Sequence, residues 1–354
     1  MPTLLEISQG RNVPLSAGIM QAVYTQTPAL SAFDARTASG TKFQTLALTG
    51  LPTAGGFVNY GEGFTSANAT LGLREFEAKL TGGKVQAERI TANEWNRTHA
   101  ASGVTYFDLQ LNARMITEMK NIEKVIFYGT AQDAKGFPGL KELTPFTGAL
   151  SLTADPGATD YVTPVINAAG TTATTASSVY SVVYGEMDAQ LVLCNDGGGE
   201  LFTMTEIIEQ HLAPDPTNAP LATLVYDVSQ IYGYFGLSVG GMNQTQTGGV
   251  PTQYSVRRLA NLTEDSGKGL TDAKLEQLVL SHGDNIQPSV LFMNGRSGRQ
   301  WADSRSASTA TLFLGMSGDA KNNTGSLRAA RPTNFEGIPV VYTSAIRSTD
   351  AIEA

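Results

Sequence analysis

The sequence predicts an α+β fold, and three observations lead to that prediction. Residues 104–128 carry the apolar period of one long helix, whereas much of the chain after residue 178 alternates with the period of two that strands show. Helical and strand patterns follow one another without the regular strand–helix–strand order of a parallel sheet, and the sequence shows no internal repeat. At 354 residues, the chain is long enough for about two domains.

The helix predicted over 104–128 is the strongest single pattern in the chain. Its apolar face carries side chains three or four residues apart, namely Leu111, Met115, Met119, Ile122 and Ile126. Gly129 follows as the expected stop. Such a helix is about 37 Å long at a rise of about 1.5 Å per residue, which suits a strut along an elongated subunit.

The part of the chain before this helix is predicted to depend on a neighbour. Residues 1–42 are polar and show no sustained period, so an extended arm is expected. Residues 43–90 predict a long two-stranded hairpin with a polar tip and a turn at Gly82–Gly83. Because an isolated hairpin is marginally stable in water, this one needs a second surface. A short helix is expected to start at Thr91, which forms a capping box with Glu94.

The part of the chain after the long helix is predicted to be mainly strands. Residues 144–178 are rich in small residues and are expected to form a loop or a domain entry. Alternating or short apolar patterns predict strands at 178–184, 189–194, 224–239, 289–293 and 335–342. Helices are expected at 270–280 and 295–304, and a loop at 315–331. Residues 202–212 fit either a short helix or an irregular loop.

The composition is that of a globular protein with few charges. Hydrophobic residues make up 41% and charged residues only 16%, with Thr, Ser, Asn and Gly in their place. Because interface cores are depleted in Lys, Glu and Asp, this composition favours packing against copies of the same chain. The net charge of −8 argues against a dedicated nucleic-acid binder, which needs basic residues to neutralise phosphates.

Cys194 is the only cysteine, which excludes an intrachain disulfide and a cysteine zinc site and indicates folding in the cytosol. The N-terminal residues lack the basic and apolar regions of a signal peptide. No run of about 18 apolar residues occurs, so no membrane contact is expected.

No residue is predicted to be catalytic, to bind a cofactor or to hold a metal. The three histidines, His99, His211 and His282, lack a metal-ligand spacing and are expected to be structural. Neither a Gly-x4-Gly-Lys-Ser/Thr phosphate loop nor a Gly-x-Ser-x-Gly elbow occurs. Four acids are expected to be solvated in loops, with a cation site as the alternative: Asp155, Asp160, Glu186 and Asp188. The alternating aromatic residues of 226–235 lack basic neighbours, so core packing is favoured over base stacking.

Five short motifs stand in a fixed order along the chain. They are Tyr60-Gly61-Glu62-Gly63, Ile90-Thr91 with Glu94, Ile122-Glu123 leading to Gly129, the run 136–140, and the run 335–341. In this order of arm, hairpin, long helix and motifs, the chain resembles the major capsid proteins of tailed bacteriophages, a family with the Hong Kong 97-type fold. The resemblance covers nearly all of the chain from about residue 43. The family's order of elements carries this resemblance, because each motif alone is short.

The resemblance implies a division into five parts. Residues 1–42 are expected to be an N-terminal arm lying across a neighbour, and 43–90 an extended loop over the adjacent subunit. A peripheral domain is expected over 91–144, with 104–128 as its spine helix. The resemblance further implies an axial domain at 145–330, around the five- and six-fold axes, and a return strand at 331–354.

The implied function is structural and not enzymatic. Copies are expected to assemble through pentamers and hexamers into an icosahedral shell around a double-stranded DNA genome, in the host cytoplasm, and to remain in the virion. Repeated heterologous contacts close such shells, and many modest contacts stabilise them. The implied partners are a portal protein, a separate scaffolding protein and, as an open point, a decoration protein, with the DNA contacted only non-specifically. Some members cross-link a lysine of the extended loop to an asparagine of a neighbour; Lys42, Lys79 and Lys84 are available here, and no partner asparagine is identified.

Two other functions stay open. The same fold forms the shells of encapsulin-like bacterial nanocompartments, which would enclose a cargo enzyme. A hydrolase or carbohydrate-binding enzyme is motivated only by polar loops and scattered acids, and the absence of a catalytic constellation disfavours it.

Overall fold

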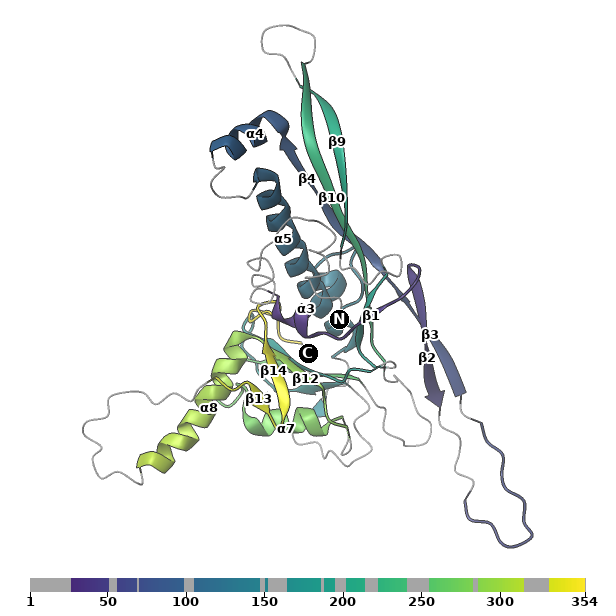
Figure 1. Ribbon diagram of the computed structural model, residues 1–354. Coiled ribbons are helices and arrows are strands. Elements are labelled where there is room, and N and C mark those ends of the chain that lie inside the picture. The colour runs from purple at the N-terminus through teal and green to yellow at the C-terminus, as the bar shows by residue number, and fades with distance from the viewer. Residues whose placement is uncertain are drawn as a thin grey trace.

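The computed structural model describes residues 27–50, 56–68, 70–98, 105–146, 150–151, 164–185, 188–194, 202–213, 222–240, 255–282, 286–314 and 331–353. These residues form an elongated upper lobe, a lower lobe, and a hairpin that projects beside them (Figure 1). Each lobe is built on its own sheet, with helices packed against it. The predicted α+β class is confirmed.

The upper lobe is a long sheet with a helix laid along it. Its strands are β1 (Ala35–Thr37), β4 (Lys79–Glu88), β8 (Gln190–Leu193), β9 (Thr203–Ala213) and β10 (Ala222–Ser238). The order is β1–β8–β10–β4, and β9 also pairs with β10. β10 is central because β4, β8 and β9 all pair with it antiparallel. Of its aromatic residues, Phe235 is fully buried, whereas Tyr232 and Tyr234 are half-buried on the other face.

Helix α5 (Tyr106–Tyr128) confirms the long helix predicted over 104–128, with a start two residues later than predicted. The Thr105 hydroxyl caps its N-terminus by accepting from the Asp108 amide at 3.1 Å. The five apolar side chains of the predicted face are all buried, in one core with Ile231 and Phe235 of β10. Gly129 ends the helix with a φ of 54°, and a Cβ there would overlap the backbone nitrogen of Gly139. The short helices η2 (Gly129–Ala131) and α6 (Leu140–Leu143) follow.

The lower lobe is a mixed sheet covered by two helices. Its strands are β5 (Leu150–Ser151), β6 (Val165–Asn167), β7 (Ser177–Val182), β11 (Val256–Leu262), β12 (Val290–Met293), β13 (Asn334–Phe335) and β14 (Ile338–Tyr342), in the order β13–β14–β12–β7–β11–β6–β5. The helices are α7 (Asp272–Leu280) and α8 (Gly295–Leu314). Trp301 of α8 is fully buried against Leu275 and Phe335, and its indole N–H donates to Asp272 at 2.6 Å.

Residues 27–38 are anchored in their own chain, so the extended arm predicted for 1–42 is wrong there. After α3 (Pro28–Ala32), the ring of Phe33 is fully buried and stacks on Phe292 of β12 at 5.3 Å. Phe127 of α5 meets the same Phe292 ring at 5.7 Å. This aromatic cluster joins segments far apart in sequence, which is why local polarity did not reveal it. Residues 1–26 lie outside the described residues.

The projecting hairpin consists of β2 (Lys42–Gly50) and β3 (Thr70–Glu77), which is shorter than the predicted 43–90. The predicted turn at Gly82–Gly83 is wrong, because both residues lie inside β4 and pair with β10. A Cβ on Gly82 would overlap the Ile231 carbonyl, and one on Gly83 would overlap the Arg114 side chain. These glycines therefore permit a close approach between neighbouring segments.

Helix α4 (Arg89–Thr98) begins before Thr91, so the predicted N-cap is wrong. The Thr91 hydroxyl instead donates to the Glu88 carboxylate at 2.8 Å from within the first turn. β4 continues directly into α4, and Arg89 is held to Asp227 of β10 by an ion pair of 2.6 Å. Tertiary pairing thus sets where this helix starts.

Further differences arise from strand pairing. β9 occupies the range predicted as a helix or loop over 202–212, because its backbone pairs along β10. β5 and β6 lie within 144–178, which was predicted as a loop or domain entry, and α8 extends beyond the predicted end at 304. Residues 145–330 do not form a separate unit, because β8, β9 and β10 share a sheet with β4. Residues 315–330 lie outside the described residues.

Candidate assembly site

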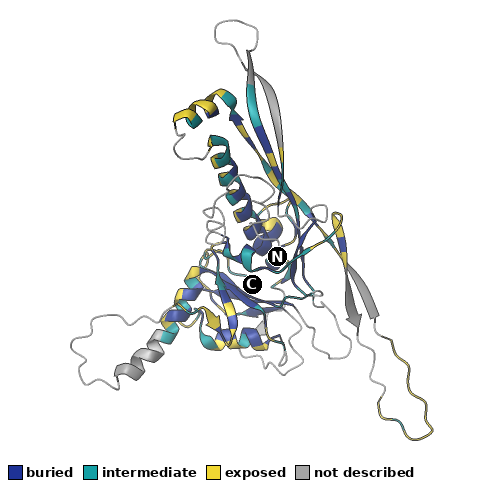
Figure 2. Ribbon diagram, in the orientation of Figure 1, coloured by how far each residue is buried: buried dark blue, intermediate teal, exposed yellow. Residues whose placement is uncertain are grey.

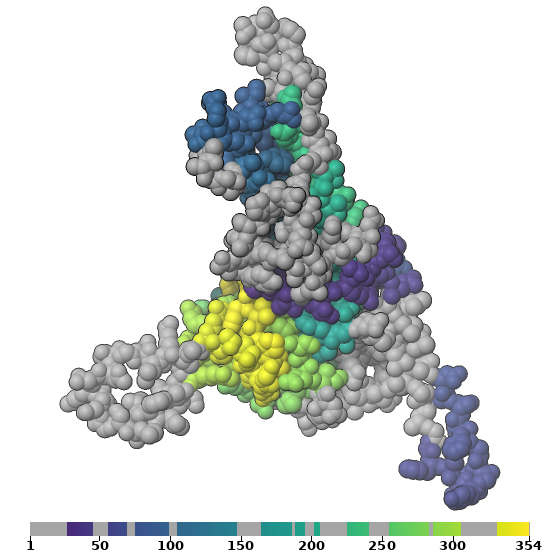
Figure 3. All heavy atoms as spheres, in the orientation of Figure 1, coloured from purple at the N-terminus to yellow at the C-terminus, as the bar shows by residue number. Residues whose placement is uncertain are grey.

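The loop between β2 and β3 is the most exposed apolar feature of the described chain. We call residues 56–68 the tip loop. Three of its aromatic side chains are almost fully exposed: Phe57 at 109%, Tyr60 at 111% and Phe64 at 86% of their reference areas. The tip loop is exposed along its length (Figure 2) and stands clear of the lobes in the space-filling view (Figure 3). Grouped exposed aromatic residues of this kind mark interaction surfaces.

A local turn gives the tip loop some order. The Asn59 amide donates to the Glu62 carboxylate at 2.9 Å, and the Glu62 amide donates back to the Asn59 carbonyl at 3.1 Å. Hydrogen bonds from the Asn59 backbone and side chain hold the pKa of the Glu62 carboxyl below its ordinary value. The tip loop therefore presents one negative charge among its aromatic side chains.

The base of the hairpin is attached to the upper lobe. Phe43 of β2 is buried with Ala78, Val192 and Cys194, and its ring stacks on Phe76 of β3 at 5.6 Å. This small cluster fixes the origin of the hairpin while leaving its tip without an intrachain apolar partner among the described residues. Cys194 is a buried free thiol.

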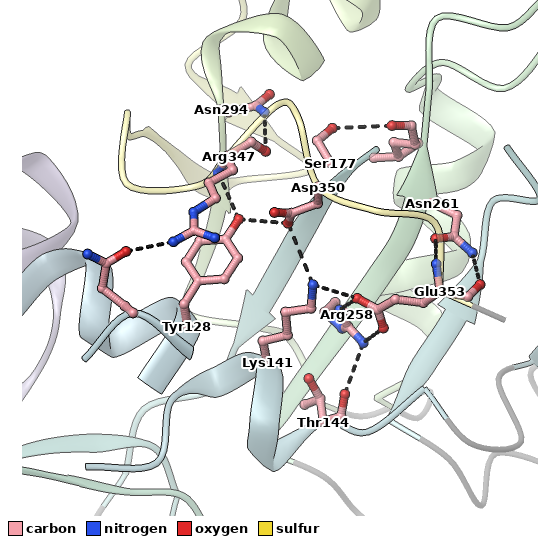
Figure 4. A network of polar contacts seen from close by, with 12 residues as sticks. Tyr128, Lys141, Thr144, Ser177, Arg258, Asn261, Asn294, Arg347, Asp350 and Glu353 are labelled. Carbon is pink, nitrogen blue, oxygen red and sulfur yellow. Dashed lines mark hydrogen bonds and ion pairs between the residues drawn. The ribbon is translucent and has the colours of Figure 1, made fainter. Parts of the chain in front are cut away.

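A buried ion-pair network joins the C-terminal segment to both lobes (Figure 4). Arg258 of β11 is fully buried, and its guanidinium donates to both carboxylate oxygens of Glu353, at 2.7 and 2.6 Å. Arg258 also donates to the Thr144 carbonyl at 3.1 Å. Lys141 of α6 lies 2.9 Å from Glu353 and 3.7 Å from Asp350. The network therefore ties residues 350–353 to α6 and to the lower sheet.

The end of α5 completes this junction. The Tyr128 hydroxyl donates to Asp350 at 2.8 Å and accepts from the Arg347 amide at 2.8 Å. The Arg347 guanidinium lies 4.4 Å from the centre of the Tyr128 ring, a cation–π contact. Helix α5 is thus fixed at its C-terminal end by residues more than two hundred positions later in the chain.

The pKa shifts in the junction follow from burial and pairing. Burial opposes the charge on Glu353, but the hydrogen bonds and charges of Arg258 and Lys141 outweigh it and lower the pKa of this carboxyl. Burial also opposes the charge on Arg258, and Glu353 and Tyr180 outweigh it and raise the pKa of the guanidinium. Burial raises the pKa of the Tyr128 phenol, so it stays protonated and acts as a donor. The arrangement is a structural clamp.

Glu123 of α5 forms a second clamp at the junction. One carboxylate oxygen accepts from the Ala29 amide of α3 at 2.8 Å and from the Thr343 hydroxyl at 2.9 Å. Burial raises the pKa of the Glu123 carboxyl, although these hydrogen bonds act in the opposite direction. Glu123 therefore connects α3, α5 and Thr343, which directly follows β14.

Two of the residues considered for metal chemistry, His282 and Asp188, have side chains that the structure describes. Among the residues that the structure describes, no group of three metal-ligating side chains occurs. His282 is buried, with its Nε2 atom 2.8 Å from the Ser181 hydroxyl, as expected of a structural histidine. Asp188 is half-buried, and burial raises the pKa of its carboxyl. His99, Asp155, Asp160 and Glu186 lie outside the described residues, and His211 is described only in its backbone, within β9.

The three lysines considered for cross-linking lie on β2 and β4. Lys42 pairs with Glu75 at 2.9 Å and Lys79 with Glu77 at 2.5 Å, and Lys84 lies within β4. Over the described ranges, no helix combines the length and apolar character needed to cross a bilayer. The sequence singled out Tyr60, Glu62 and Glu123 only as parts of motifs, and it did not reveal Arg258 or Glu353. The aromatic residues within an otherwise polar tip were the signal available for the loop.

Comparison with known proteins identifies the fold. No protein-family model matches the chain, and no curated protein matches it in sequence. A chain in the cryo-EM structure of bacteriophage Epsilon15 is similar at a TM-score of 0.53 and 14% identity, covering 91% of this chain and 88% of that one. The chain has a Hong Kong 97-like fold.

Two other structures are similar at lower scores. The bacteriophage JBD30 capsid aligns at 10% identity over 98% of both chains, with a TM-score of 0.42. A holo-SrpI encapsulin complex from Synechococcus elongatus aligns at 8% identity over 73% of this chain and 95% of that one, with a TM-score of 0.41. Since TM-scores below 0.5 do not establish a shared fold, the fold assignment rests on the Epsilon15 chain.

Proposed function

We propose that this chain is the major capsid protein of a tailed double-stranded DNA bacteriophage. The observation that carries the proposal is the tip loop: three almost fully exposed aromatic residues project from a Hong Kong 97-like subunit. Burying these aromatic side chains against a partner removes their apolar area from water, and copies of the same chain provide that partner in a repeating shell. The function is therefore structural, without a catalytic step.

The parts of the subunit receive the following roles in this proposal. The hairpin of residues 42–77 is the extended loop, and its tip loop lies on the adjacent subunit. The upper lobe, with α5 as its spine helix, is the peripheral domain. The lower lobe is the axial domain, which surrounds the five- and six-fold axes. The segment 331–353 returns to the peripheral domain through the junction at Tyr128.

Assembly proceeds through pentamers and hexamers into an icosahedral shell in the bacterial cytoplasm, and the protein remains in the virion. Each pairwise contact is modest, and the shell is stabilised because each subunit makes several contacts at once. A portal protein and a separate scaffolding protein are the further partners, with a decoration protein as an open point. The net charge of −8 agrees with packaged DNA being contacted only non-specifically.

Electron microscopy of the full chain, produced in bacteria with its scaffolding protein, tests this proposal. Closed shells with five- and six-fold capsomers are expected. A protein that stays monomeric at high concentration under these conditions contradicts the proposal. Shells that enclose a cargo enzyme and never package DNA would instead identify an encapsulin-like nanocompartment, which uses the same fold.

A further inference from the structure

A cleft at the junction of the two lobes gathers positive charge. It has a volume of about 750 Å³, within the range of small-ligand sites. Four cationic side chains line it, and no Asp or Glu does: Lys120, Arg296, Arg331 and Arg347. We call it the cationic cleft. In a chain with a net charge of −8, such a segregation of charge is unexpected from composition alone.

The four cations come from separate parts of the fold. Lys120 is exposed on α5, and Arg296 lies in the first turn of α8. Arg331 precedes β13, and Arg347 lies in the C-terminal segment beside Tyr128 (Figure 4). The residues between β14 and Asp350 form much of the remaining wall. The cleft is thus assembled by the tertiary fold.

The arginines are held in place without being neutralised. The Arg296 guanidinium donates to the backbone carbonyls of Ser348, at 2.6 Å, and of Leu262, at 3.1 Å. Arg331 lies 3.5 Å from the centre of the Tyr342 ring, and Arg347 donates to the Gln132 side chain at 2.7 Å. Among the described residues, none of the four cleft cations forms an ion pair with a carboxylate.

Three carboxylates outside the lining attract these cations: Glu123 attracts Lys120, and Glu264 and Asp350 attract Arg296. Glu123 accepts hydrogen bonds from Ala29 and Thr343, and Asp350 accepts from Tyr128 and lies near Lys141. Glu264 lies 3.7 Å from Arg299, outside the cleft. Because none of these three carboxylates lines the cleft, its lining carries a net positive charge. Asn294 and Gly295, at the N-terminal end of α8, form part of the same wall, and the helix dipole adds to the positive potential there.

We infer that the cationic cleft binds a phosphate-bearing ligand. Planar guanidinium groups match the geometry of phosphate oxygens, and an ammonium group adds a point charge. The cleft is large enough for more than one phosphate group, so the ligand is either a free polyphosphate-type anion or a nucleic-acid backbone. This inference concerns a site on the folded subunit and does not depend on assembly into a shell.

Calorimetric titration of the full chain with inorganic pyrophosphate at low ionic strength tests the inference. Saturable binding is expected. In the double variant Lys120→Gln and Arg331→Gln, the dissociation constant is expected to rise at least tenfold, because two of the four charges are lost. Both side chains are exposed, which favours retention of the fold, and circular dichroism checks it. Lys124→Gln is the matched control, since Lys124 is an exposed lysine one turn along α5 that does not line the cleft, and it should leave binding within twofold of the wild type.

Two competition arms identify the source of the ligand. A short single-stranded oligonucleotide that displaces pyrophosphate points to nucleic-acid phosphate, whereas a failure to displace it points to a free polyphosphate-type anion. Displacement by an oligoglutamate peptide as effective as that by the oligonucleotide overturns the phosphate assignment, because it shows a general acidic-peptide site. Absence of saturable pyrophosphate binding, or an equal loss in Lys124→Gln, overturns the inference altogether.

Discussion

The lobe junction and the tip loop use similar residue types in opposite ways. At the junction, the ring of Phe33 is fully buried and Arg258 is paired with Glu353 inside the chain. In the tip loop, Phe57 is fully exposed, and at the base of the hairpin the ion pair between Lys42 and Glu75 is exposed to solvent. The difference indicates that the junction stabilises the single subunit, whereas the hairpin contributes only when a second subunit covers it.

Exchanging one phenylalanine in each region gives the largest expected contrast. Phe33→Ala should lower the free energy of unfolding of the unassembled subunit by about 3–5 kcal/mol, because it removes a fully buried ring. Phe57→Ala should leave that free energy unchanged and reduce the yield of assembled shells. Urea unfolding and electron microscopy measure the two effects. Equal destabilisation by both substitutions would remove the distinction between the regions.

Replacing one cationic residue by methionine in each region is expected to give the next largest difference in stability. Arg258→Met leaves Glu353 without its principal partner, so a loss of about 3 kcal/mol is expected in urea unfolding. Lys42→Met removes an exposed partner of Glu75 and should not measurably change the unfolding midpoint. An unchanged free energy of unfolding in Arg258→Met would show that the junction network does not hold the C-terminal segment in place.

Helix α5 and the lobe junction differ in how well the sequence predicts them. Helix α5 was predicted because its apolar face and its glycine stop are local features. The junction was not predicted, because its partners are far apart in the sequence. Arg258 and Glu353 are separated by 95 residues, and Tyr128 and Asp350 by 222. β9 was missed because its backbone partner is β10, and Gly82–Gly83 was mistaken for a turn because close packing and turning both favour glycine. Where the local sequence pattern fits more than one structure, the long-range partner of the segment therefore determines which structure forms.

Gly129 tests the end of the spine helix. Gly129→Ala should destabilise the subunit by about 1–3 kcal/mol, because alanine at a φ of 54° is strained and its Cβ would overlap the backbone of Gly139. Gly267→Ala is the matched control, since Gly267 also has a positive φ, of 75°, but open space around its Cβ position. Thermal unfolding that shifts further for Gly129→Ala supports tight packing at the junction, and equal shifts argue against it.

The smallest expected effect is on pH dependence. Glu353 has a pKa below its ordinary value in the folded chain, so its stabilising contribution is present above about pH 4.3 and is lost as the pH falls through the lowered pKa. Glu353→Gln should therefore flatten the fall in the free energy of unfolding below about pH 4.3. Urea unfolding as a function of pH measures this slope. An unchanged slope would show that the Glu353 charge contributes little.

Glu123 provides a control of opposite sign. Burial raises the pKa of its carboxyl, so its contribution is present at pH values below the ordinary pKa and is lost as the pH rises through the raised pKa. Glu123→Gln retains an oxygen that accepts from Ala29 and Thr343 and carries no charge. Its stability relative to the wild type should therefore increase with pH, measured in the same series, and a relative decrease would contradict the assignment.

Cryo-electron microscopy of the full chain assembled with its scaffolding protein tests the central claim most directly. We expect a closed icosahedral shell in which Phe57, Tyr60 and Phe64 of each subunit are buried against an adjacent copy. A tip loop that remains fully exposed in the shell, or that folds back onto its own lobes in a stable monomer, would contradict the account.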